Sequence, residues 1–243
     1  MKSIVYKIAT GIVMVLLISG CAGKGLLVVD DNVAKYMQES KKVVVYTPDV
    51  HIISVGVGSA KEDLINTKDA LEEFKKLSFS NLSDNYVVNK LPDELTCGIL
   101  EEDQCSNNLI LDSRNIIKSI WESRGAFNST PENFEYYINK KTTDEFKDAD
   151  LVVYINAVEF SRTPARITTD FLFSVTLGVI TGYIPIVTFN DYANIIVYDR
   201  DSGKAILHDQ IIGKYDLSDK EEVQEIVDRL LMNLYNNELL AMN

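Results

Sequence analysis

Runs of β-branched and other apolar residues recur along the chain and predict most of its strands. They occupy residues 43–46, 50–57, 85–89, 151–160, 193–198 and 205–212. Thr47-Pro48-Asp49 separates the first two runs and predicts a turn or kink, because proline has no amide hydrogen to donate. Asp199-Arg200-Asp201-Ser202-Gly203 separates the last two and predicts a hairpin in which Gly203 adopts a positive φ.

Apolar residues at helical spacing predict three longer helices. The first is expected to open at Ser59, where Glu62 completes a capping box, and the last at Ser218, where Glu221 does the same. The second spans residues 109–124, whereas 132–148 predict only a broken helix. The expected core faces are, in chain order, Leu64, Leu71 and Phe74 with Leu77 close by; Ile116, Ile117, Ile120 and Trp121; and Val223, Ile226, Val227, Leu230, Leu231 and Leu234.

The order of these elements predicts the fold class. Strands alternate with helices early, and consecutive strands with a closing helix follow, which favours an α/β (α+β) domain. We expect a mixed sheet with helices mainly on one face, and an apolar hairpin-like excursion at about 167–190. Residues 43–243 would form this single domain, and residues 21–42 a tether with a short strand and a short helix.

The first residues have the anatomy of an export signal. Lys2 and Lys7 precede an almost wholly apolar stretch, and Ile18-Ser19-Gly20-Cys21 follows it. A positive start, a short apolar core and small residues at the cut predict that residues 1–20 are cleaved. The aliphatic–small–small–cysteine pattern resembles the lipobox of bacterial lipoproteins, in which diacylglycerol alkylates the thiol and cleavage follows on its N-terminal side.

This resemblance implies that Cys21 is the lipid-bearing N-terminus of the mature chain. Its amino group would also be acylated, for example with palmitate, and several acyl chains make an effectively permanent membrane anchor. Ala22, rather than aspartate, follows the cysteine. By resemblance to enterobacterial sorting, this favours the outer membrane, facing the periplasm, if the organism has two membranes.

The charge balance narrows the class of partner. The formal charge is −12 for the whole chain and becomes −14 without the leader, which contains Lys2 and Lys7 and no acidic residue. An acidic surface repels phosphate backbones and anionic head groups, so we expect no nucleic-acid partner. Membrane contact must come from the lipid on Cys21 or from apolar segments.

Two cysteines remain in the mature chain besides the anchor. Cys97 and Cys105 flank an acidic loop, and export would place them in an oxidising compartment. The favoured interpretation is a disulfide that closes this small loop. A metal site or redox pair is less favoured, because no histidine lies nearby and the spacing is not CxxC.

Residues 171–190, between Asp170 and Asp191, form a run of twenty without a charge. Its length fits a membrane span with a Gly178-xxx-Gly182 packing face, but Pro185 and many β-branched residues argue against a helix. A single crossing would also separate strands that should share one sheet.

Two other interpretations of residues 171–189 stay open. Apolar and mixed positions alternate, as in a barrel strand, so a β-hairpin could insert in a membrane within an oligomer, as in the curli-secretion pore. We favour the third interpretation, an excursion buried against its own domain or a partner. The candidate membrane or partner contacts are Phe171, Phe173, Val175, Leu177, Val179, Ile184 and Ile186.

Catalytic and metal-binding motifs are not visible in the sequence. His51 and His208 lie in predicted strands outside any HExxH or Ser/His/Asp pattern, and no GxSxG elbow occurs. Gly56-Val57-Gly58 lacks the third glycine and the lysine of a phosphate loop, and the 199–203 hairpin departs from calcium-loop spacing. We therefore expect no enzyme, no metal and no cofactor, and structural roles for both histidines.

Short motifs in both halves resemble a loose group of bacterial lipoproteins. They are Tyr46-Thr47-Pro48-Asp49-Val50-His51-Ile52 with the following glycines, Asp148-Ala149-Asp150-Leu151-Val152-Val153-Tyr154, and Val197-Tyr198-Asp199 with Ser202-Gly203. The resemblance covers roughly residues 43–235 and implies an α/β domain like the N-terminal domain of the Tol-system protein TolB and curli-pore lipoproteins. It brings no catalytic residues, and the cysteine loop departs from the pattern.

Together these features predict a non-enzymatic envelope lipoprotein with a binding or assembly role. Its partner would be another envelope protein or a second copy of the chain, with 171–189 as the contact. The alternative is a subunit of an oligomeric secretion or pore assembly that inserts 171–189 as a membrane β-hairpin.

Overall fold

The computed structural model describes residues 26–30, 33–40, 42–83, 87–90, 105, 107–123, 135–163, 167 and 190–235. Three sets of predicted residues lie outside these ranges: the leader with Cys21, Cys97 of the expected disulfide, and all contact residues expected within 171–189. The expectations for these residues remain predictions.

Eight strands form one mixed sheet, which confirms the predicted α/β fold class. The strands are β1 (Leu26–Val29), β2 (Lys42–Val45), β3 (Asp49–Gly56), β4 (Ser59–Glu62), β5 (Val87–Lys90), β6 (Leu151–Arg162), β7 (Asp191–Asp199) and β8 (Ala205–Gly213). The helices are α2 (Val33–Glu39), α3 (Leu64–Ser83), α4 (Asn108–Ser123), α5 (Lys140–Asp144) and α7 (Lys220–Tyr235). The main path runs β1-β8-β7-β6-β2-β5, and β3 joins β4 to β6.

β6 lies in the middle of the sheet. Along one of its edges it pairs first with β2 and then, further along, with β3. β2 pairs in parallel with residues 151–153, and β3 pairs in parallel with residues 156–162. The predicted kink at Thr47-Pro48-Asp49 separates the two, and Tyr46 still donates its amide to the Val153 carbonyl at 2.9 Å. The two predicted strands therefore follow one line along β6, where Pro48 interrupts the ladder.

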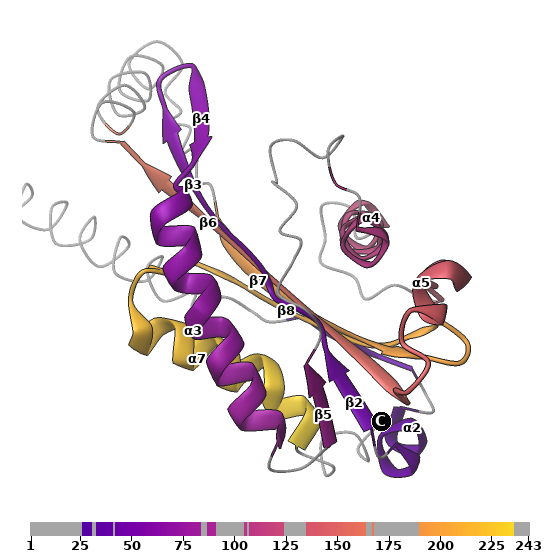
Figure 1. Cartoon of the computed structure of the whole chain (residues 1–243). Helices are drawn as coiled ribbons and strands as arrows, with labels where there is room; N and C mark the ends of the chain where they lie inside the picture. The colour runs from indigo at the N-terminus through magenta and orange to yellow at the C-terminus, as the bar shows by residue number, and fades with distance from the viewer. Residues whose placement is uncertain are drawn as a thin grey trace, which may run out of the picture.

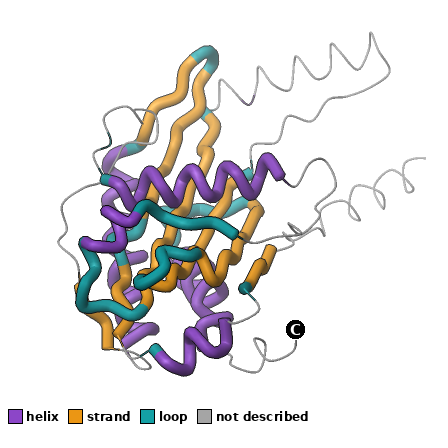
Figure 2. The backbone as a smooth tube through the Cα atoms, turned by 90° about the vertical axis from the view of Figure 1, so that its right-hand side faces the viewer, coloured by secondary structure: helices purple, strands orange, loops and turns teal. Residues whose placement is uncertain are grey.

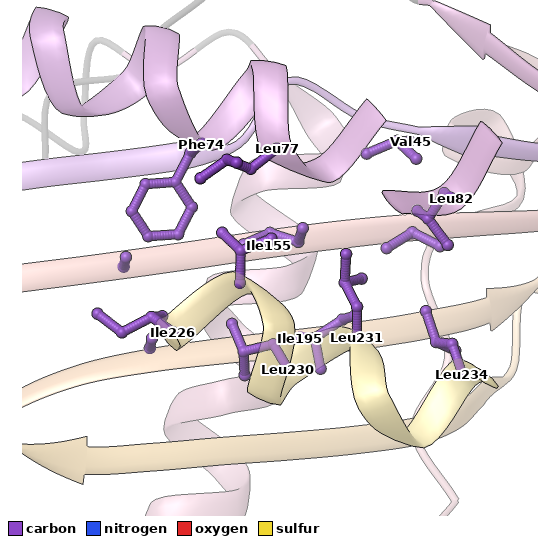
Figure 3. Close-up of a cluster of buried hydrophobic side chains, with 14 of the residues drawn as sticks. Val45, Phe74, Leu77, Leu82, Ile155, Ile195, Ile226, Leu230, Leu231 and Leu234 are labelled. Atoms are coloured by element: carbon purple, nitrogen blue, oxygen red, sulfur yellow. The ribbon is translucent and has the colours of Figure 1, made fainter. Parts of the chain in front are cut away.

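Each face of the sheet carries its own hydrophobic cluster. Helices α3 and α7 cover one face, where Phe74, Leu77, Leu230 and Leu231 pack on Ile155 and its neighbours (Figures 1 and 3). The six-residue stripe predicted for the last helix is at most 2 % exposed. The opposite face, which we expected to be largely open, is covered by α4 and α5 (Figure 1).

The first predicted helix begins later than expected. Residues 59–62 form β4, which turns back on β3 after the hairpin at Val57-Gly58, where Gly58 has φ 74°. Pairing with β3 satisfies the backbone of this segment, so the Ser59–Glu62 capping box does not form. Asp63 caps α3 instead, because its side chain accepts the Asn66 amide at 3.2 Å.

The last helix also uses a different cap, and the N-terminal segment is more ordered than predicted. Asp219 accepts the Glu221 amide at 2.8 Å and opens α7 at Lys220, whereas Ser218 hydrogen-bonds to Asp216. β1 and α2 lie within the expected tether, and β1 pairs antiparallel with β8 from Leu26 onwards. Residues 26–29, expected in the tether as a short strand, therefore form an edge strand of the sheet.

The β3–β4 hairpin projects at one end of the sheet (Figure 2). β6 ends at the same place, since Arg162 is the register partner of Val55. β7 begins there, where Asp191 accepts the Phe160 amide at 2.8 Å. In the part of the chain that is described, no helix has the length and apolar character needed to cross a membrane.

Candidate functional site

A buried carboxylate, that of Asp49, organises the α4 side of the sheet. Arg114 of α4 grips it with two hydrogen bonds, from Nε to Oδ2 at 2.9 Å and from Nη2 to Oδ1 at 2.8 Å. The Tyr154 hydroxyl on β6 donates to Oδ2 at 2.6 Å, and the Asn156 amide donates to the same oxygen at 3.2 Å. Asp49 is 2 % exposed, so this dense set of donors replaces the water that its charge has lost.

His51 extends the network toward β4. It lies two residues from Asp49 on β3, so both side chains point to the same face of the sheet. Its Nε2 lies 2.7 Å from Asp49 Oδ1, and its Nδ1 lies 2.5 Å from Glu62 Oε1. A carboxylate at each ring nitrogen favours the doubly protonated imidazolium.

The pKa values follow from this arrangement. Burial of His51 opposes its charged form, but the hydrogen bonds from its ring to Asp49 and Glu62 raise its pKa to about 9. Burial likewise opposes ionised Asp49, yet hydrogen bonds from His51 and Arg114 hold its pKa well below the usual range. Two acidic side chains, Asp49 and Glu62, thus face two basic ones, Arg114 and His51, within this site.

Three polar contacts hold α4 on the sheet and so position Arg114. Asn107 caps the helix by accepting the Ile110 amide at 3.1 Å, and its own amide donates to the Tyr46 hydroxyl. Ser113 hydrogen-bonds to the Tyr198 hydroxyl on β7 at 2.8 Å. The Arg114–Asp49 pair is the third contact, made by the residue that directly follows Ser113.

Buried polar side chains continue from Asp49 across the neighbouring strands. Asn156 on β6 accepts from the Asn194 amide on β7 at 3.4 Å. Asn194 Oδ1 in turn accepts from the Gln210 amide on β8 at 2.8 Å and lies 3.2 Å from His208 Nε2. A row of hydrogen-bonded side chains thus crosses four strands, β3, β6, β7 and β8.

A pocket of about 400 Å³ opens between α4 and this row. Arg114 and Asn156 belong to both the network and the pocket wall. The described residues that line it are Leu111, Arg114, Asn115, Ile117, Lys118, Trp121, Asn156 and Tyr192. Trp121 and Tyr192 meet edge to face with their ring centroids 6.2 Å apart. The wall therefore combines two aromatic rings with two cationic side chains.

The sequence prediction for these residues was partly right. His51, expected to be structural or solvent-facing, is 1 % exposed and has a carboxylate at each ring nitrogen. The spacing Asp49-x-His51 on a strand was a visible sign that these two residues share a face. Arg114, Tyr154 and Asn156 carried no local signal. Trp121, predicted to be core, is 43 % exposed at the pocket.

Of the predicted contact and disulfide residues, only Cys105 is described, and it is not among the described residues that line this pocket. Cys105 is half-buried just before α4, but Cys97 lies outside the described residues, so their pairing stays a prediction. The contacts expected from Phe171 to Ile186 also lie outside. Within the described ranges, no group of three histidine, cysteine or acidic side chains is placed to hold a metal ion.

A second feature lies at the end of the sheet that holds the β3–β4 hairpin. Exposed apolar side chains gather there: Val57 in the hairpin turn, Leu64 and Ile65 at the start of α3, and Ile167 after β6. Their exposed fractions are 56 %, 71 %, 77 % and 54 %. Leu64 was predicted to face the core, but the later start of α3 turns it to solvent. We call these four residues the apolar end.

Comparison with known proteins gives only distant likenesses. No family model and no curated protein matches the chain. A PelC dodecamer from Paraburkholderia phytofirmans aligns with a TM-score of 0.36 and 10 % identity, over 87 % of this chain and 96 % of that one. The LpoB C-terminal domain from Salmonella enterica aligns with a TM-score of 0.26 and 11 % identity, over 76 % and 99 %. At TM-scores below 0.5, no property of either protein is transferred to this chain.

Proposed function

We propose that this chain is a non-enzymatic envelope lipoprotein whose domain binds a partner through the apolar end and the adjoining segment 171–189. The observation that carries the proposal is the position of the exposed apolar residues. Val57, Leu64, Ile65 and Ile167 lie where β6 ends and β7 begins, which is where the uncharged segment leaves and rejoins the sheet. Contiguous exposed apolar surface in an acidic protein favours a protein or membrane contact.

The connection between β6 and β7 bears on the three interpretations of the segment. The two strands are antiparallel neighbours, paired from Leu151 with Asp199 to Val158 with Tyr192. A helix that crossed a membrane once would place these strands on opposite sides, so the pairing argues against the single-span interpretation. A buried or partner-bound excursion is compatible with the pairing.

The same pairing supports a second candidate function. Adjacent antiparallel strands are the starting point of a longer hairpin, so 171–189 could extend β6 and β7 into a membrane within an oligomeric pore. That alternative predicts that the chain needs detergent even after Cys21→Ser removes the lipid. The partner-binding proposal predicts that the Cys21→Ser chain stays in solution without detergent.

Site-specific photo-crosslinking in intact cells tests the proposal on the full lipidated chain. A photoreactive amino acid at position 65 should yield adducts with one partner species, and so should one at position 57. The matched control is position 232, because Met232 is a 48 % exposed apolar residue on α7, away from the apolar end. Absence of adducts from both 57 and 65, or equal adducts from 232, would contradict the proposal.

A further inference from the structure

The pocket beneath α4 is independent of the apolar end and has a different chemistry. Its rim contains Lys118, an exposed residue that makes no ion pair within the part of the chain described. Arg114 also reaches the pocket, but Asp49 already balances its charge. Lys118 therefore places a positive charge at the rim, one turn after Arg114 on the same helix. None of the described lining residues is acidic.

Aromatic surface forms another part of the wall. Trp121 keeps 43 % of its surface exposed, although its ring is held against Tyr192. Tyr192 also packs against Phe160, with centroids 6.4 Å apart, so the ring pair has a fixed base on the sheet. Aromatic rings prefer offset or edge-to-face partners at such distances, and an aromatic ligand could add to the stack.

Two amide side chains, Asn115 and Asn156, also line the pocket. Asn156 is 3 % exposed, and its hydrogen bonds to Asp49 and Asn194 fix its orientation. Mostly apolar walls with a few oriented polar groups are typical of small-molecule sites, and a volume of about 400 Å³ lies within the usual size range of such sites, roughly 300–1,000 Å³.

We propose that this pocket binds small organic anions that combine a carboxylate with an aromatic ring, such as arylacetates. The carboxylate lies toward Lys118 and the exposed edge of Arg114, and the ring lies against Trp121 and Tyr192. The charged side chains among the described lining residues are both cationic, Arg114 and Lys118, so the pocket favours an anion locally although the chain as a whole carries a charge of −12. The proposal does not depend on the partner contact at the apolar end.

The chain contains one tryptophan, so its fluorescence reports on this pocket alone. Purified full-length lipoprotein is titrated with phenylacetate, phenylacetamide or acetate at constant ionic strength, with excitation of Trp121. Phenylacetate should change the emission in a saturable manner in the millimolar range. The neutral amide and the ring-free acetate should each bind at least about tenfold more weakly, since each lacks one of the two interactions.

Two surface variants separate pocket binding from general charge effects. Lys118→Gln should weaken phenylacetate binding by roughly 3- to 10-fold, as expected for loss of one partly exposed ion pair. Lys68→Gln removes an exposed lysine from α3, on the other side of the sheet, and should leave binding unchanged. An unsaturable response, equal binding of acid and amide, or equal loss in both variants would overturn the proposal.

Discussion

Arg114 and Asp49 form a two-bond ion pair between α4 and β3, although 65 residues separate them in the chain. Their side chains are 11 % and 1 % exposed. Taking both charges out of water is costly, and the geometry offsets that cost by giving Asp49 four donor groups: Arg114, His51, Tyr154 and Asn156. The pair therefore fixes where α4 lies on the sheet.

Arg114→Met should destabilise the fold strongly, because it leaves the Asp49 carboxylate buried with fewer partners. We expect a loss of about 3–5 kcal/mol in the free energy of unfolding, measured by urea denaturation. Lys76→Met, which breaks the exposed Lys76–Glu73 pair at 2.9 Å, should cost less than about 1 kcal/mol. Adding Asp49→Asn to Arg114→Met should recover part of the loss. A cost for Arg114→Met as small as that of the control would contradict this account of the pair.

Stability should fall with rising pH because of His51. Its pKa is about 9 in the folded protein, above the ordinary 6.5, so the folded state holds the proton more tightly than the unfolded chain. The stabilisation is therefore complete below pH 6.5 and is lost as the pH rises through about 9. The slope should not exceed about 1.4 kcal/mol per pH unit for this one proton. Urea denaturation between pH 6 and 9.5 should show a flatter dependence for His51→Gln, and an unchanged slope would remove His51 as the cause.

Two glycines with the same backbone conformation should respond differently to alanine. Gly58 and Gly203 have φ values of 74° and 70°, which both strain an L-residue. A Cβ at Gly203 would meet the Ile138 carbonyl and a Thr143 methyl, each at 3.0 Å, whereas one at Gly58 has open space. Gly58→Ala should cost about 1–2 kcal/mol, and Gly203→Ala clearly more. Thermal melting of the two variants provides the comparison, and equal costs would argue against the close contact.

Phe74 and Ile65 lie nine residues apart on α3 and should differ widely in their contribution to stability. Phe74 is fully buried against α7, so Phe74→Ala should cost about 3–5 kcal/mol. Ile65 is 77 % exposed at the apolar end, so Ile65→Ala should change the free energy of unfolding by less than about 0.5 kcal/mol. Urea denaturation checks both values. A large cost at Ile65 would mean that its surface is buried within the domain, which would also weaken the proposed partner contact.

Patterns within short stretches predicted most elements correctly. The stripe from Val223 to Leu234 fits the single buried face of α7, and Gly203 lies in the hairpin between β7 and β8 as expected. The buried face depends on the spacing of apolar residues, and the hairpin depends on the backbone freedom of glycine. Both are properties of a short stretch of sequence. One prediction failed where strand pairing competed with a helix signal in the same residues. The Ser59–Glu62 capping box does not form, because pairing with β3 makes the same residues a strand.

By itself, the sequence determined the alternation of strands and helices, the mixed α/β class and the buried stripes, because local periodicity selects which residues turn away from water. Only the tertiary structure decided that α4 covers the second face, that Leu64 and Trp121 are exposed, and that Asp49 meets Arg114. These outcomes depend on contacts between segments tens of residues apart. The energies of these contacts arise from desolvation and from hydrogen-bond geometry. Neither can be predicted from the spacing of residues along the chain.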